Sequence, residues 1–518
     1  MPLAQSQIDT LDNISSSIYI NRYDGGLNTT DSNEILRDNE SIIRKNWGND
    51  NVGALQKVRG YTKMNSSAMG AKPILGLFRV YQSDGTTKLL AVCDTKLFFS
   101  DDDGATFTGA TSGTGLSATA FNSGVNYNDL FFFSNTTDNL QHYTPGTDTM
   151  AAATDQPTDP CGVILKRTDR RLLALVNAVN GSTLYFSKID PTGAAADDWS
   201  AANDAGSIAI DGAKSEPLTG GMTFGATDIL FKSYGAFKVW GYPNPQAIHM
   251  PGSPGSVSPY SMAQGDGLGF HLSPSKEIWM WDGNKFIKVS DSVKEFLNSI
   301  NDSFIQNCFG VYRNGFYWFF YTSSGGTTND KCLIYDVFHS DPYSGRNIWF
   351  ERPSLPINNP IVFDGPGDGN KLYGGASAAT GFVYRLDFSS SGADVTADIE
   401  AINQTKYFNA DTPHLVKRFK KIHIRYYLST GSLLINWYTN RGSTSGSFTL
   451  APSQTGTKLG SFTLGTDSLV GPVEITHTEQ LPDNAIGKDV SIKITSDASG
   501  DAPIIRDMEI EWEGMYFE

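Results

Sequence analysis

The sequence predicts a mainly β protein, in which a β-propeller of about six blades precedes an additional antiparallel β-sandwich. Short runs of strand-forming residues recur from Ile74 onward at intervals of roughly 40 to 50 residues, the spacing of four-stranded propeller blades. The 518 residues include 52 glycines and 12% aromatic residues, a composition typical of many short strands joined by tight turns. The stretch from Leu89 to Phe107 contains two such strands and a complete turn signature.

Changes in composition divide the chain into three parts. Residues 1–73 are predicted to form an N-terminal arm and first strands that join the closure of the propeller. Residues 74–394 form the propeller itself, and residues 395–518 form the C-terminal β-sandwich. The loop Ser389–Gly392 precedes this last part, and polar and apolar residues alternate along the strands predicted after it.

One turn is predicted in detail. The pattern S-x-D-x-G-x-T-[FW], known as an Asp box, resembles a turn that recurs in β-propellers such as sialidases, and it is matched by Ser100, Asp102, Gly104, Thr106 and Phe107. The short polar side chains can satisfy the turn's own backbone donors, the glycine adopts a conformation that a Cβ would resist, and the aromatic ring packs under the blade. We therefore predict a structural turn and not a substrate site. A degenerate copy ends at Trp199, and Asp282-Gly283 makes another tight turn.

The sequence allows two arrangements at the end of the propeller. Residues 361–386 can supply a seventh blade, or they can share the closure of the ring with an N-terminal strand. A helix is predicted from Ser290 to Ile300, with Ser290 or Ser292 as its N-cap and Val293, Phe296, Leu297 and Ile300 on one face.

A dense basic run stands out in the predicted sandwich. Its candidate interaction residues are Lys417, Arg418, Lys420, Lys421 and Arg425. Regular alternation along a strand would place Phe419, Lys421, His423 and Arg425 on one face. Two interpretations stay open: a solvated start of a strand, or a surface that pairs with an acidic neighbouring subunit and fixes its register.

Charge argues against an ordinary nucleic-acid-binding surface. The formal net charge is −15, whereas binding to phosphates requires an excess of Lys and Arg. An acidic surface could still line a duct through which DNA slides without being gripped. The first residues, MPLAQSQIDT, have neither a basic nor an apolar leader region, so we expect a soluble protein made in the cytoplasm, without a membrane anchor.

The sequence predicts no catalytic residue, no metal site and no cofactor. The four cysteines are widely spread without a C-x-x-C pair, and they are expected to be reduced and buried. The seven histidines are isolated, and no phosphate-binding loop is present.

The order of motifs near the N-terminus resembles a known family. Gly25-Gly26-Leu27-Asn28 is followed by a polar segment with Glu34-Ile35-Leu36 and Asn46-Trp47, and then by Val58-Arg59-Gly60-Tyr61. This order is similar to that of the tail nozzle proteins of short-tailed bacteriophages, also called tail tubular protein B or packaged-DNA stabilisation proteins. The resemblance extends in pattern over residues 18–400.

The resemblance implies a structural virion protein of a phage tail. Such a protein forms a homo-oligomeric ring, hexameric by resemblance, that extends or closes the DNA-ejection channel and helps retain packaged DNA. Its expected partners are further copies of itself, other tail proteins such as the adaptor, fibres or receptor-binding proteins, and double-stranded DNA in transit, without sequence specificity. It would be assembled in the host cytoplasm and located in the tail of the virion.

Two other functions remain as alternatives. The first is a lectin-like propeller whose exposed Trp and Tyr side chains stack on glycans. The second is a sialidase-like glycosidase, which would need several arginines to converge on a carboxylate. The candidate arginines are Arg170, Arg171, Arg313, Arg346, Arg352 and Arg385.

Overall fold

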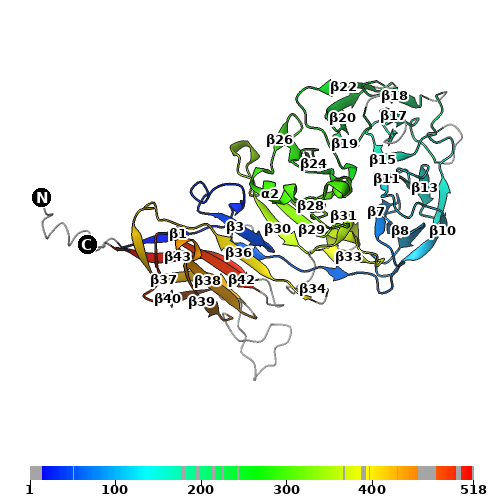
Figure 1. Ribbon diagram of the computed structural model, residues 1–518. Coiled ribbons are helices and arrows are strands. Elements are labelled where there is room, and N and C mark those ends of the chain that lie inside the picture. The colour runs from blue at the N-terminus through cyan, green and yellow to red at the C-terminus, as the bar shows by residue number, and fades with distance from the viewer. Residues whose placement is uncertain are drawn as a thin grey trace, which may run out of the picture.

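The computed structural model describes residues 15–515 apart from internal gaps. The gaps are residues 51, 177–180, 194–197, 202–203, 213–215, 225–226, 242–243, 366–367, 387–392, 396, 429, 453–473 and 497–502. Strands dominate the described residues, which form a β-propeller and a β-sandwich (Figure 1). The predicted fold class is therefore confirmed.

Within the described residues, seven units of four antiparallel strands form the blades of the propeller. Blades 1 and 2 join into one eight-stranded sheet through a parallel pairing of their outer strands, and blade 6 is part of a ten-stranded sheet. Blade 1 contains β7 (Ile74–Tyr81), β8 (Thr87–Cys93), β9 (Lys96–Ser100) and β10 (Thr108–Thr114). Blade 2 contains β11 (Ser123–Tyr127), β12 (Leu130–Ser134), β13 (Gln141–Thr144) and β14 (Thr149–Ala152). Blade 3 contains β15 (Cys161–Lys166), β16 (Leu172–Val176), β17 (Thr183–Phe186) and β18 (Gly206–Ala209). Blades 4 and 5 are β19 (Gly220–Phe224), β20 (Thr227–Lys232), β21 (Gly235–Trp240) and β22 (Gln246–Met250); and β23 (Ala263–Gly265), β24 (Leu268–Leu272), β25 (Ile278–Trp281) and β26 (Phe286–Lys288). Blades 6 and 7 are β27 (Phe309–Arg313), β28 (Phe316–Tyr321), β29 (Lys331–Asp336) and β30 (Trp349–Pro353); and β31 (Ile357–Gly365), β32 (Asp368–Ala376), β33 (Val383–Leu386) and β6 (Thr62–Lys63).

The ring closes through a strand from the N-terminal part of the chain. Tyr384 and Arg385 of β33 pair with Lys63 and Thr62 of β6, so the outermost strand of blade 7 precedes blade 1 in the sequence. The inner strands β31 and β7 pack against each other and complete the circle. Residues 361–386 therefore supply a seventh blade and share the closure of the ring with an N-terminal strand, whereas the sequence favours about six blades.

The predicted helix is shorter than expected. A 3-10 turn, η3 (Asp291–Val293), leads into one turn of α-helix, α2 (Lys294–Asn298). Ser290 does not cap the helix, because its hydroxyl accepts the amide of Ile278 in blade 5 at 3.0 Å. The apolar face is as predicted, since Val293, Leu297 and Ile300 are buried in the propeller core. The other helical turns are η2 (Pro259–Ser261), η4 (Asp302–Asn307), η5 (Pro342–Ser344) and η6 (Asn440–Gly442).

Two sheets make the sandwich, and the N-terminal segment contributes strands to both. Sheet one contains β1 (Ser15–Ile20), β4 (Trp47–Asn49), β5 (Leu55–Lys57), β37 (Val416–Tyr427), β40 (Ile475–Gln480), β41 (Ile486–Gly487) and β43 (Ile504–Met515). Sheet two contains β2 (Gly26–Leu27), β3 (Glu40–Lys45), β36 (Ala401–Thr405), β38 (Leu433–Thr439), β39 (Thr444–Leu450) and β42 (Val490–Ser496). A small hairpin, β34 (Ala393–Asp394) and β35 (Ala397–Asp398), precedes β36. Of the strands expected to join the propeller closure, only β6 does so.

The core of the sandwich combines both ends of the chain. Ile18, Trp47 and Leu55 from the N-terminal segment pack with Ile422 and Ile510 from the C-terminal part in one buried cluster. Strand β1 runs antiparallel to β43 along its whole length, from Ser15 opposite Glu513 to Ile20 opposite Met508. Burial of apolar area therefore holds the N-terminal segment to the sandwich.

Candidate interaction sites

The Asp-box turn is held together by its own side chains. Asp102 accepts hydrogen bonds from the Thr106 amide at 2.9 Å, the Thr106 hydroxyl at 2.6 Å and the Ser100 hydroxyl at 2.7 Å. Partial burial acts to raise the pKa of Asp102, but these hydrogen bonds outweigh it and lower the pKa below its usual value. Gly104 has a φ of +91°. The ring of Phe107 is partly buried against a hydrophobic cluster that includes Leu89 and Tyr373. The five residues form the turn that the sequence predicts.

The related motifs occupy the same position in their blades. The Asp box joins the third and fourth strands of blade 1, and Asp282-Gly283 does so in blade 5. Trp199 lies between the third and fourth strands of blade 3, but residues 194–197 of this degenerate copy lie outside the described residues. In blade 5, Asp282 accepts the amides of Asn284 and Lys285, each at 2.8 Å. Because strands alternate in direction within a blade, the connections between third and fourth strands lie at the same end of the propeller in all three blades.

A β-bulge alters the predicted faces of the basic strand β37. The pairing of β37 with β43 shifts register between Phe419 and Lys421, so Lys420 is the extra residue. Phe419, Ile422 and Ile424 consequently share the buried face. The predicted alternation, which placed Phe419 with Lys421, is therefore wrong beyond the bulge.

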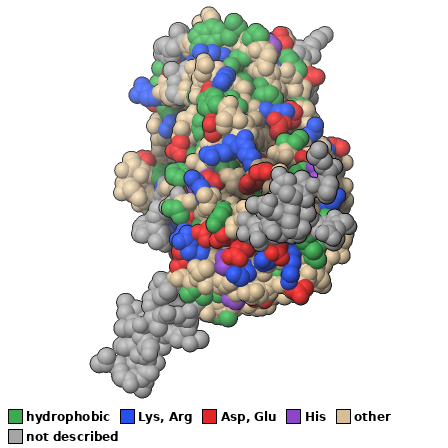
Figure 2. Space-filling model, turned by 90° about the vertical axis from the view of Figure 1, so that its left-hand side faces the viewer, with side chains coloured by type: hydrophobic (Ala, Val, Ile, Leu, Met, Phe, Trp, Pro, Cys, Tyr) green, Lys and Arg blue, Asp and Glu red, His purple; other side chains and the backbone are tan. Residues whose placement is uncertain are grey.

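The basic side chains of β37 find acidic partners within the same sheet. Register places Arg418 opposite Glu513, Lys421 opposite Glu511, and Arg425 opposite Asp507. Arg418 lies 3.7 Å from Glu513, Lys421 lies 3.3 Å from Glu511, and Arg425 lies 3.1 Å from Glu474. Lys420 pairs with Glu513, and Arg425 also pairs with Asp507. The view onto this end of the molecule shows basic and acidic side chains intermixed (Figure 2).

Lys417 is not part of this surface. Its side chain is buried, and its Nζ donates to the carbonyl oxygens of Thr412 at 2.7 Å, Lys488 at 3.0 Å and Leu415 at 3.1 Å. Burial lowers the pKa of Lys417 to about 8. The expectation that it forms an exposed interaction residue is wrong, because the strand turns every second side chain inward.

The arginines considered for a sialidase-like site do not converge. Arg170 and Arg171 lie in blade 3, Arg385 lies in blade 7, and the other three belong to blade 6 or its loops. They make separate contacts: Arg170 with Asp190, Arg171 with the Asp204 carbonyl, Arg313 with the Asn370 carbonyl, Arg346 with the His339 carbonyl, and Arg352 with Asp394.

Among the described residues, no group of three His, Cys, Asp or Glu side chains is arranged to hold a metal ion. The four cysteines are buried and unpaired, and burial raises the pKa of Cys93 to about 11 and that of Cys161 to about 12. No helix in the described part of the chain is long and apolar enough to span a membrane.

The propeller and the sandwich share a sheet. Lys45 of β3 pairs with Glu351 of β30, so the sheet of blade 6 continues into sheet two of the sandwich (Figure 1). Buried Arg352 reinforces this junction: it donates to Asp394 at 2.7 Å and to the Asn46 side chain at 3.3 Å. Buried Arg44 of β3 donates to the carbonyl oxygens of Trp47 and Tyr23 and to the Asn49 side chain.

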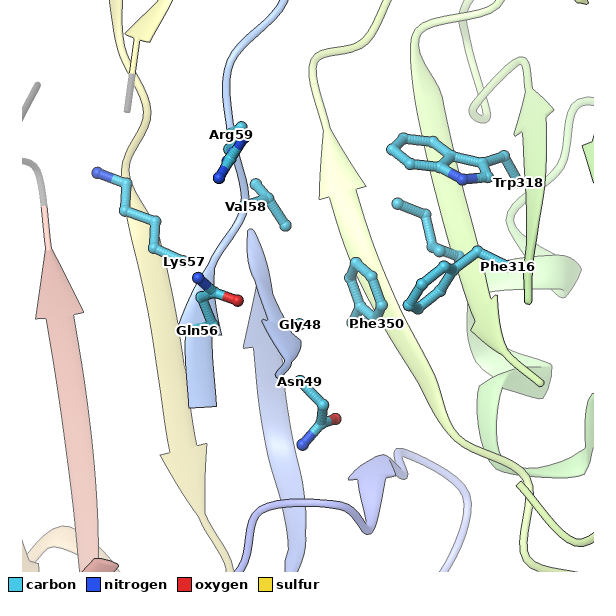
Figure 3. A pocket seen from close by; sticks show the side chains of 10 residues that line it. Gly48, Asn49, Gln56, Lys57, Val58, Arg59, Phe316, Trp318 and Phe350 are labelled. Atoms are coloured by element: carbon cyan, nitrogen blue, oxygen red, sulfur yellow. The ribbon is translucent and has the colours of Figure 1, made fainter. Parts of the chain in front are cut away.

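A pocket with a volume of about 260 Å³ lies at this junction, and we call it the junction pocket (Figure 3). It opens between blade 6 and the segment that leads from β4 through β5 to the propeller. Its lining residues are Gly48, Asn49, Gln56, Lys57, Val58, Arg59, Phe316, Trp318, Ile334 and Phe350. Val58 and Arg59 belong to the motif that the sequence singles out, whereas the aromatic residues come from blade 6.

A second pocket, of about 400 Å³, lies at the end of the propeller opposite the Asp-box turn. It is lined by residues at the starts of inner strands and by the loops after β28 and β32. Buried Asn329 organises its polar side: it donates to Asn358 at 2.9 Å and to the Asn307 carbonyl at 2.9 Å, and it accepts from Thr322 at 2.9 Å. Nothing in the sequence pattern indicated this pocket, because its residues meet only when the ring closes.

Comparisons with known proteins give similarity only to solved structures. No family model matches the sequence, and no curated protein matches it. A crystal structure of the computationally designed Ika8 protein aligns with a TM-score of 0.39 at 9% identity, covering 63% of this chain and 99% of that chain. The structure of YCF48 bound to D1 peptide aligns with a TM-score of 0.39 at 11% identity, covering 64% of this chain and 97% of that chain. A chain of the mitotic checkpoint complex aligns with a TM-score of 0.41 at 8% identity, covering 62% and 94%. The fold assignment follows from the strand pairing itself, and these structures assign no function to the chain.

Proposed function

We propose that the chain is a structural subunit of the tail of a short-tailed bacteriophage. Copies of it would form a ring, hexameric by resemblance, that extends or closes the DNA-ejection channel and helps retain packaged DNA. The proposal rests on the resemblance of the motifs between residues 25 and 61 to the tail nozzle proteins, and on the construction of the junction.

The observation that carries the proposal is that the N-terminal segment ties both domains into one body. Strands β1 to β5 belong to the sandwich and β6 belongs to blade 7, while β30 and β3 join blade 6 to sheet two. Domains joined by a simple linker move relative to each other by default. A shared sheet with a buried ion pair resists that motion, as a subunit that bears the pressure of packaged DNA requires.

Charge is consistent with this role. The basic strand β37 is neutralised by Glu511, Glu513 and neighbouring carboxylates, so this face has few cations available to displace counterions from phosphates. The intramolecular pairs also weaken the interpretation in which β37 recognises an acidic neighbouring subunit. Contacts between subunits would then come from other surfaces.

The oligomeric mass tests the proposal most directly. Sedimentation and negative-stain imaging of the purified full chain should give a closed ring, and mass spectrometry of purified virions should detect the chain. A protein that stays monomeric at all concentrations and is absent from virions would overturn the proposal.

The second pocket favours one alternative, a glycan-binding propeller. The amide and hydroxyl groups of this pocket are held in place by the hydrogen bonds of Asn329, and such groups form hydrogen bonds with the hydroxyls of sugars. Phe121 adds an aromatic surface. Binding of the labelled protein to a glycan array should then be lost in Asn358→Ala and kept in Asn139→Ala, which changes an exposed amide elsewhere. An array without any specific signal would remove this alternative.

A further inference from the structure

The floor of the junction pocket is apolar and is built on paired strands. Trp318, Ile334 and Phe350 lie on three neighbouring strands of blade 6 in direct register, so their side chains share one face of the sheet. Ile334 is fully buried, and Trp318 keeps only 7% of its surface exposed. Phe316 and Val58 are half-buried at the rim. Such a floor is preformed and needs no rearrangement to accept an apolar side chain.

Gly48 keeps the pocket open on the side of the sandwich. A Cβ at this position would lie 3.3 Å from the ring of Phe350, so any larger residue would press on the floor. The side chain of Lys57 turns away from the cavity, whereas Phe316 and Phe350 face it (Figure 3). The space is therefore bounded by aromatic rings on one side and by the backbone of β4 on the other.

Three polar groups around the pocket lack partners in the described part of the chain. No hydrogen bond joins the indole Nε1 of Trp318, or the side-chain amide of Gln56, to another described residue. The guanidinium of Arg59 is exposed and forms no ion pair with a described residue. Two of these groups, the Trp318 indole and the Arg59 guanidinium, are only donors and are open to solvent, so a ligand that replaces their water should bring an acceptor.

The volume of the pocket and the charge of Arg59 limit the kinds of ligand that can bind there. A volume of about 260 Å³ is below the roughly 300–1,000 Å³ of typical small-molecule sites, and it suits one or two side chains. Arg59 provides a positive charge in a protein whose net charge is −15, so a carboxylate is complementary here. A polyanionic nucleic acid would meet the acidic remainder of the molecule and is disfavoured.

We propose that the junction pocket is a docking site for a protein segment that inserts one aromatic or branched apolar side chain beside a carboxylate. The apolar side chain packs on Trp318 and Phe350, and the carboxylate pairs with Arg59. An acceptor on the inserted segment takes the indole N–H of Trp318. This site does not depend on the proposed function, because any partner with this chemistry would fit it.

Fluorine NMR on the full chain labelled with 5-fluorotryptophan provides the test. Trp318→Phe assigns the resonance among the nine tryptophans. The probe is an acetylated and amidated tetrapeptide, Gly-Phe-Asp-Gly. It should shift the Trp318 resonance saturably, with a dissociation constant of about 1 mM or lower. Replacing Phe by Ala in the peptide should weaken binding by about tenfold or more, because the apolar anchor is lost.

The contribution of charge is measured separately. Arg59→Gln, and Asn in place of Asp in the peptide, should each weaken binding by about fivefold, and the two changes together should cost little more than either alone. Arg37→Gln, which changes an exposed arginine away from the pocket, should leave binding unchanged. The proposal is overturned if the resonance does not shift, if the Ala peptide binds equally well, or if a thymidine oligonucleotide binds more tightly than the peptide. Each of these results leaves the test of oligomeric mass unaffected.

Discussion

Replacing Asp394 by Ala should weaken the junction between the propeller and the sandwich. Its carboxylate pairs with Arg352 at 2.7 Å and accepts the backbone amide of Tyr61 at 3.1 Å. Arg352 is 2% exposed, so without Asp394 its charge would stay buried, and its remaining side-chain hydrogen bond among the described residues would be the one to neutral Asn46. Removing one member of a buried ion pair costs about 3–5 kcal/mol. Because the Asp394 side chain keeps 19% exposure, we expect the lower end, about 3 kcal/mol.

Urea unfolding followed by tryptophan fluorescence measures this loss, with Asp398→Ala as the matched control on the same hairpin. Asp398 is exposed, and the control should change the free energy of unfolding by less than about 0.5 kcal/mol. The double variant Arg352→Met with Asp394→Ala should regain a large part of the loss, because no buried charge remains. If Asp394→Ala matches its control, or if the double variant is no better, the ion pair does not hold the junction.

Three further measurements address the turn, the basic strand and a buried histidine. Asp102→Ala should lower the free energy of unfolding by about 1 kcal/mol without changing the oligomeric state; a loss of assembly at unchanged stability would contradict a structural role. Lys417→Met should lower the free energy of unfolding by about 2 kcal/mol, because three carbonyl oxygens lose their buried donor. Lys420→Met at the surface should change it by less than about 0.5 kcal/mol. Equal losses in the two variants would contradict the buried role of Lys417. His271 is fully buried, and burial lowers its pKa to about 3, so the unfolded chain binds the proton more tightly. Stability should therefore fall as pH drops from 6.5 toward 3, by about 2 kcal/mol at pH 5, and His271→Phe should lack this component; an NMR titration in which His271 protonates near pH 6 would refute it.

The sequence predicts a structural element correctly where that element is stabilised by its own residues. The Asp-box turn is an example, because all the hydrogen bonds of Asp102 are to residues within four positions. Blades 1 to 6 are predicted for a similar reason, since each is a meander of strands that follow one another in the sequence, whereas blade 7 takes its outermost strand from Thr62–Lys63. The helix is shorter than its sequence predicts, because the hydroxyl of Ser290, a good N-cap by residue type, accepts the amide of Ile278 in strand β25 instead.

The candidate sites could be predicted only in part. Val58 and Arg59 belong to a motif in the sequence, but the aromatic floor beside them comes from β28 to β30, more than 250 residues later in the chain. The basic run of β37 is also evident in the sequence. Its neutralisation by Glu511 and Glu513 could not be read from the sequence, because it depends on the register with β43.

The sequence by itself determined the fold class, the repeated blades and the turns that join their strands, because these depend on contacts between residues that are close in the chain. Tertiary structure decided the closure of the ring by Thr62–Lys63, the place of Ser15–Ile20 beside β43, and the bulge that buries Phe419 together with Ile422. Pairings between residues hundreds of positions apart are selected by the burial of a shared core and by the register of the partner strand. Neither is encoded in a single segment, so both appear only in the folded chain.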